Sequence, residues 1–160
     1  MITLEFLENV TVFRELNDDQ LTKIQQHCQE AKFSRGDKIF GTGEKPEFLW
    51  VVMEGQVDLQ WERPGRSSLP ESTITRLSES MTFGWSSLVP PYSYSLSAHC
   101  ATRSCKVMQV DRDELINLLE QDAEIGYKVM LELLSVVGSR FLNLQDEVAR
   151  QRGSDIINQW

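Results

Sequence analysis

Residues 33–57 read FSRGDKIFGTGEKPEFLWVVMEGQV, a series of short apolar runs separated by glycine-containing turns. The run at 48–53 has the length of a buried strand, and Glu54-Gly55 after it is a tight turn. Val57 and Leu59 then alternate with polar residues, as in a strand with one buried face. Segments 96–102 and 105–110 have the same character, so the pattern predicts a β-sandwich or barrel.

Helical patterns lie on both sides of this β region. Residues 3–10 fit a short amphipathic helix, and Asn17, followed by acidic residues, predicts the N-cap of a second helix. A short helix opens at Asp111, and Asp122 is the expected cap of a long helix that ends near Arg150. We therefore predict one domain over residues 1–150, with helices in 1–30, the β region in 31–110 and helices in 111–150. A polar tail is expected over 151–160.

The long helix carries two apolar stripes. The inner stripe comprises Ile125, Val129, Leu133 and Val136. The outer stripe repeats with a strict 3,4 spacing and comprises Tyr127, Met130, Leu134, Val137, Phe141, Leu144 and Val148. A helix with one partner needs only one stripe, so we expect the inner stripe on the β core and the outer stripe on the same helix of a second chain. The alternative is one wide apolar face buried within a single chain.

Composition limits the classes of function. The 160 residues include 16 Lys+Arg and 24 Asp+Glu, for a net charge of −8, which disfavours direct nucleic-acid binding and a basic membrane-surface patch. The N-terminus lacks a signal-peptide pattern, and no apolar run is long enough to cross a membrane. Three cysteines without a CxxC pair favour reduced thiols. We expect a cytoplasmic domain.

The glycine string Gly36, Gly43 and Gly55 resembles the cyclic nucleotide-binding domain family, as in the catabolite activator and fumarate-nitrate regulators. The resemblance covers about residues 6–150 and extends to Phe83-Gly84 and to the segment 105–107. It implies a mainly β fold, a double-stranded β-helix or jelly roll with flanking helices, in which the long C-terminal helix is the dimer seam. Transcription factors of this family carry a helix-turn-helix after that helix. The chain ends shortly past it, so we expect the sensor half alone, unless the chain is a fragment.

The resemblance also implies where a ligand would bind. The family's phosphate cassette reads F-G-E-x-[AS]-L and, after a variable stretch, R-[ST]-A; its Glu binds the ribose and its Arg pairs with the cyclic phosphate. The matching residues here are Phe83, Gly84, Trp85, Ser86, Ser87 and Leu88, followed by Ser95, Leu96 and Ser97. Trp85 stands at the Glu position and Ser95 at the Arg position. No Arg or Lys lies between Thr82 and Ala101, so the cassette is degenerate and a cyclic nucleotide is a doubtful ligand.

Other side chains near the cassette allow two interpretations. The amides of Ser86 and Ser87, with hydroxyls of the 93–97 segment, are candidates to hold an anion weakly, and the Trp85 indole is expected to fill the ribose space. Tyr92, Tyr94 and Trp85 fit packing against the barrel better than stacking on a base. Arg140 is a candidate to face the pocket from the long helix, and a solvated surface side chain is its equally good alternative.

These observations favour a non-enzymatic, homodimeric regulatory or sensor domain with a small-molecule ligand or a regulatory protein as partner. No Ser-His-Asp arrangement, Walker-type loop or clustered metal ligands are present in the sequence. A ligand-free dimeric scaffold for protein interactions is the alternative. A haem-based sensor that uses His99 is a weaker third hypothesis.

Overall fold

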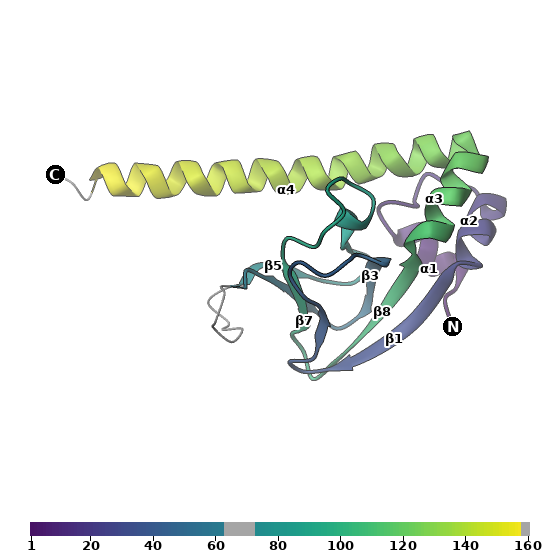
Figure 1. Ribbon diagram of the computed structural model, residues 1–160, viewed down its shortest axis with the longest axis horizontal. Helices are drawn as coiled ribbons and strands as arrows, with labels where there is room; N and C mark the ends of the chain where they lie inside the picture. The colour runs from purple at the N-terminus through teal and green to yellow at the C-terminus, as the bar shows by residue number, and fades with distance from the viewer. Residues whose placement is uncertain (63–72, 158–160) are drawn as a thin grey trace.

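The computed structural model describes residues 1–62 and 73–157, with side chains described up to residue 154. The segment 63–70, whose polar sequence with Pro and Gly predicts a hairpin loop, lies outside these described residues. Helices gather at one end of two β-sheets, and one long helix crosses over the domain (Figure 1). The elements are α1 (Leu4–Asn9), α2 (Asp18–Gln25), β1 (Cys28–Ser34), β2 (Lys38–Phe40), β3 (Phe48–Glu54), β4 (Val57–Gln60), β5 (Thr73–Leu77), β6 (Thr82–Phe83), the 3₁₀ helix η2 (Trp85–Ser87), β7 (Ser97–Cys100), β8 (Ser104–Asp111), α3 (Arg112–Gln121) and α4 (Ala123–Ile157).

The two sheets are antiparallel and have four strands each. Their orders are β1-β8-β3-β6 and β2-β7-β4-β5, so most neighbours in a sheet are distant in the sequence. Val110 of β8 lies opposite Cys28 of β1 on one side and opposite Leu49 of β3 on the other. This arrangement, with helices at one end, confirms the predicted mainly β class.

Strand β3 separates two hydrophobic cores. Leu49 and Val51 face the helices and belong to a helix-side core with residues of α1, α2, α3 and α4. Trp50 and Val52 face the space between the sheets and belong to an inter-sheet core with Phe83 and Tyr94. Because successive side chains of a strand point to opposite faces, a run that is buried on both faces must be apolar throughout, as 48–53 is.

Helix α4 buries one predicted stripe and exposes the other. Ile125, Val129 and Leu133 are buried in the helix-side core, which confirms the prediction for the inner stripe. In the outer stripe, Tyr127 is 70% exposed and Leu134 is 66% exposed. Figure 1 shows α4 running over the domain and continuing well past it. Apart from Val137, which is half-buried, the members of the outer stripe are exposed in the described part of the chain.

Two predicted boundaries are wrong. α4 continues beyond residue 150 to Ile157, where a polar tail was expected. Polar residues do not end a helix unless they break it, and Gln151 instead donates to the Glu147 carboxylate one turn earlier, at 3.2 Å. The N-terminal helical region also ends sooner than expected, because β1 already begins at Cys28.

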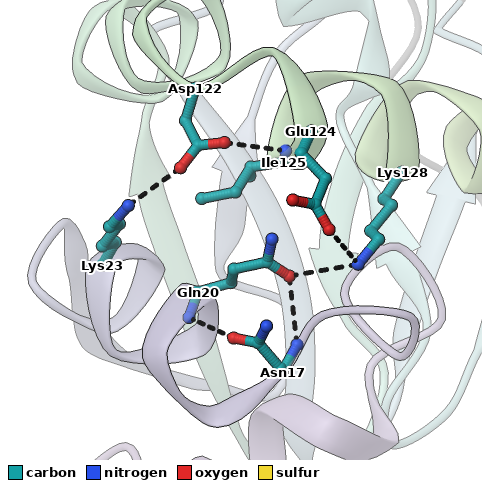
Figure 2. A network of polar contacts seen from close by, with 7 residues as sticks. All are labelled: Asn17, Gln20, Lys23, Asp122, Glu124, Ile125 and Lys128. Carbon is teal, nitrogen blue, oxygen red and sulfur yellow. Dashed lines mark hydrogen bonds and ion pairs between the residues drawn. The ribbon is translucent and has the colours of Figure 1, made fainter.

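A polar network joins α2 to the beginning of α4 (Figure 2). Asn17 and Gln20 form a reciprocal capping box, and Gln20 Oε1 also accepts from Lys128 Nζ at 3.3 Å. Asp122 caps α4 by accepting from the Ile125 amide at 3.2 Å, and its other oxygen pairs with Lys23 Nζ at 2.8 Å. Both predicted caps are confirmed. The Lys23 ammonium lowers the pKa of Asp122, and Asp122 in turn raises the pKa of Lys23.

Asp122→Asn is expected to lower the thermal midpoint near neutral pH, because it removes the charge that faces Lys23. The lowered pKa of Asp122 means that its stabilising effect is present above the ordinary carboxyl range and is lost as the pH falls through the folded-state pKa. The difference between variant and wild type should therefore shrink in acid. Thermal melts across a pH series measure it, and Asp146→Asn on the exposed part of α4 is the control. A difference that does not depend on pH would contradict the assignment.

Candidate functional site

Gly84 opens the cassette in a conformation that glycine favours. Its φ is +69°, and η2 follows with the Ser87 amide donating to Gly84 O at 3.0 Å. A Cβ added at Gly84 would lie 2.7 Å from Trp50 Cδ1 and 3.3 Å from Tyr94 Cε1. The cassette turn therefore lies directly against two aromatic rings of the inter-sheet core.

Aromatic rings fill the inter-sheet core beside Gly84. Tyr94 stacks on Phe40 with ring centroids 3.7 Å apart. The Tyr94 hydroxyl donates to Phe48 O at 2.8 Å and accepts from Trp50 Nε1 at 3.1 Å. Burial raises the pKa of Tyr94, so the hydroxyl stays protonated. Tyr94 is thus a packed core residue with both of its hydrogen-bonding roles used, as the packing interpretation predicted.

The side chains predicted to contact a ligand lie on different faces. Trp85 and Leu88 pack with the helix-side core, which agrees with the packing interpretation of Trp85. Phe83 is buried and Leu96 half-buried in the inter-sheet core. Ser95, at the position of the family's Arg, is exposed.

Two of the predicted anion donors are used within the protein. The Ser87 amide bonds to Gly84 O, and the Ser97 hydroxyl donates to Gln60 O at 3.4 Å. Ser97 is buried, whereas Ser86 is half-buried. The Ser87 amide and the Ser97 hydroxyl are therefore not free to contact an anion.

Two arginines reach the cassette backbone from the helices. Arg140 of α4 donates through Nη2 to Thr82 O, and burial lowers the pKa of its guanidinium. Arg112, at the start of α3, donates through Nε to Ser87 O at 2.6 Å and lies 4.8 Å from the Tyr92 ring centroid. The sequence pattern indicated Arg140 but not Arg112, because a basic residue at a helix start has no pattern that separates it from a surface side chain.

Comparison with known families identifies the architecture. The family model described as "Cyclic nucleotide-binding domain" matches residues 30–122. The chain belongs to the cyclic nucleotide-binding domain family. The match includes both sheets, the cassette and α3, so the family resemblance predicted from the glycine string is confirmed.

Relatives and solved structures agree with this assignment. A CRP-like cAMP-activated global transcriptional regulator of Mycobacterium tuberculosis is 25% identical over 146 residues, which are 91% of this chain and 61% of that protein. This chain thus spans less than two thirds of that relative's length. The fold is similar to a cyclic nucleotide-binding domain from Methylobacillus flagellatus, with a TM-score of 0.78 and 18% identity over 92% of this chain and 85% of the other. The Thermus thermophilus catabolite activator protein has a TM-score of 0.71 and 20% identity, over 89% and 63%. The predicted jelly roll is confirmed.

The described part of this cyclic nucleotide-binding domain also bears on metal binding and on membrane insertion. Across residues 1–62 and 73–157, no three His, Cys, Asp or Glu side chains are grouped to hold a metal ion. His99 is buried, and its Nε2 lies 3.0 Å from Ser97 Oγ, so this ring nitrogen is already paired within the sheet. No helix in the described part of the chain is both long and apolar enough to span a bilayer.

Proposed function

We propose that this chain is a non-enzymatic regulatory domain, dimeric through α4, whose cassette is held in place without the phosphate contacts that the family resemblance implies. The observation that carries the proposal is the aromatic packing beside Gly84. Trp50 and Tyr94 occupy the space against the cassette turn, and Tyr94 is hydrogen-bonded on both sides. A cyclic nucleotide is a poor fit to these residues, and any ligand is weak or of other chemistry.

The charges around the cassette support the same proposal. A cyclic phosphate needs a cation or several convergent donors, because an anion that leaves water without them loses far more than it gains. Ser95 offers an exposed hydroxyl where the family has Arg. The two guanidinium groups that come near, from Arg112 and Arg140, donate to backbone carbonyls instead. The residues around the cassette therefore do not match the phosphate contacts that the family resemblance implies.

The exposed outer stripe of α4 supports the dimer. Phe141, Leu144 and Val148 are 59%, 52% and 48% exposed, on a segment in which residues 141–152 are all exposed. Large apolar side chains repeated at 3,4 spacing are costly to leave in water and form a coiled-coil seam when a second helix covers them. A second copy of the same helix supplies the matching surface by two-fold symmetry. The seam comprises Tyr127, Met130, Leu134, Val137, Phe141, Leu144 and Val148.

A ligand-free scaffold for a partner protein is the second candidate, and the filled inter-sheet space favours it as well. The two candidates differ in whether any small molecule shifts the stability of the domain. The haem hypothesis has less support, because the Nε2 of His99 is engaged with Ser97. A Soret band in the purified protein would revive it.

Neither cyclic AMP nor cyclic GMP at millimolar concentration is expected to raise the thermal midpoint. A ligand present at about 1,000 times its Kd would stabilise the fold by about 4 kcal/mol, which corresponds to several degrees in a domain of this size. Differential scanning fluorimetry with both nucleotides, and with 5′-AMP as the control for general nucleotide effects, makes the comparison. A rise of several degrees with one cyclic nucleotide alone would overturn the proposal.

A further inference from the structure

Helix α4 leaves the domain at Arg140. The inner stripe before it is buried, with Ile125 and Val129 at 0% exposure and Leu133 at 3%. Arg140 continues this face and is half-buried, whereas every residue from Phe141 to Arg152 is exposed. In Figure 1 the C-terminal end of α4 extends past the sheets. Arg140 is therefore the outermost tether between α4 and the domain.

The tether ends on the segment that leads into the cassette. The Arg140 guanidinium donates to the carbonyl of Thr82, two residues before Gly84. Thr82 is buried, and its hydroxyl has no hydrogen-bond partner among the described residues. The half-buried, charged guanidinium thus donates a hydrogen bond to a backbone carbonyl. Such a hydrogen bond is stronger than one between two neutral groups.

Arg112 holds the other end of the same segment and provides a comparison. It donates to Ser87 O at the end of η2, but it belongs to α3, which carries no part of the outer stripe. Arg140, by contrast, is followed immediately by Phe141, a residue of the proposed seam. Of the two arginines, only Arg140 lies on the helix that a partner chain would cover.

We propose that Arg140 is a positioning residue that couples dimerisation through α4 to the order of the cassette, residues 82–88. The inference rests on the proposed dimer. A partner helix on Phe141 restricts the motion of the adjoining turn and so keeps Arg140 over Thr82. Coupling between two equilibria is reciprocal, so a cassette that is held in place also favours the dimer by the same factor. Without a partner, the uncovered half of α4 opens more readily, and the tether opens with it.

Hydrogen exchange and sedimentation on the full chain test this coupling. Arg140→Gln is expected to lower protection of the 82–88 amides about tenfold and to weaken the dimer by a similar factor. Arg140→Lys keeps the charge and one donor, and should restore part of both losses. Arg112→Gln is the matched control. It should lower protection near Ser87 but weaken the dimer much less than Arg140→Gln does, because the bond from Arg140 to Thr82 O stays in place.

The outcomes separate the inference from the proposed function. A wild-type chain that sediments as a monomer at all concentrations overturns the dimer, and the coupling with it. If the wild type dimerises and Arg140→Gln loosens the cassette without weakening the dimer, the coupling alone is wrong. Equal weakening of the dimer by Arg112→Gln and Arg140→Gln would also overturn the role of Arg140. Dimer affinity would then depend on the order of the cassette in general and not on the bond from Arg140 to Thr82.

Discussion

Phe141→Glu is expected to raise the dissociation constant of the dimer about a thousandfold. Phe141 lies within the outer stripe and is 59% exposed in the single chain. A symmetric seam contains the residue twice, so the substitution removes two buried rings and brings two like charges together. Burial of one Phe side chain stabilises by about 1.5–3 kcal/mol, and about 4 kcal/mol corresponds to a thousandfold change in affinity. Sedimentation velocity over a concentration series measures the constant.

Leu142→Glu is the matched control for this substitution. Leu142 is the next residue, and at 60% it is as exposed as Phe141, but it does not belong to the 3,4 repeat. The dimer dissociation constant of the Leu142→Glu variant should stay within about threefold of the wild-type value, as for most surface changes away from an interface. Dimers that persist in Phe141→Glu but dissociate in Leu142→Glu would place the seam on a neighbouring face of α4. Dissociation by both variants alike would indicate an effect of charge alone.

The periodicity of α4 could be predicted from the sequence, but its length could not. Burial of Ile125, Val129 and Leu133 follows from their spacing, because one face of a helix must cover the sheet. The end of the helix depends on breakers and caps. Residues 151–157 contain no Pro, and the one glycine there, Gly153, is tolerated inside the helix. Polarity alone was therefore an unreliable sign of a tail.

The local turn of the cassette was also predictable, whereas its contacts were not. Gly84 before η2 follows from the Phe-Gly motif and from the positive φ that glycine allows. The bonds from Arg112 and Arg140 join residues 25 and 58 positions apart, and no local pattern specifies such pairs. Two interpretations of Trp85 were open from the sequence, and its indole packs with the helix-side core. Side-chain direction in a short turn depends on the surrounding fold.

Gly84→Ala is expected to lower the free energy of unfolding by about 3 kcal/mol. The left-handed conformation at φ +69° costs a residue with a Cβ about 1–2 kcal/mol. The added methyl group would lie 2.7 Å from Trp50 Cδ1, and overpacking of this kind costs about 1–3 kcal/mol more. Urea denaturation followed by tryptophan fluorescence measures the loss.

Gly43→Ala separates these two contributions. Gly43 has φ +82°, and a Cβ there would meet nothing within 4 Å, so only the conformational cost of about 1–2 kcal/mol should appear. The difference between the two variants therefore reports how firmly Trp50 and Tyr94 pack against the cassette turn. Equal losses would mean that the rings give way at little cost. The space beside Gly84 would then be open to a ligand, and the proposal of a cassette held without one would lose its main support.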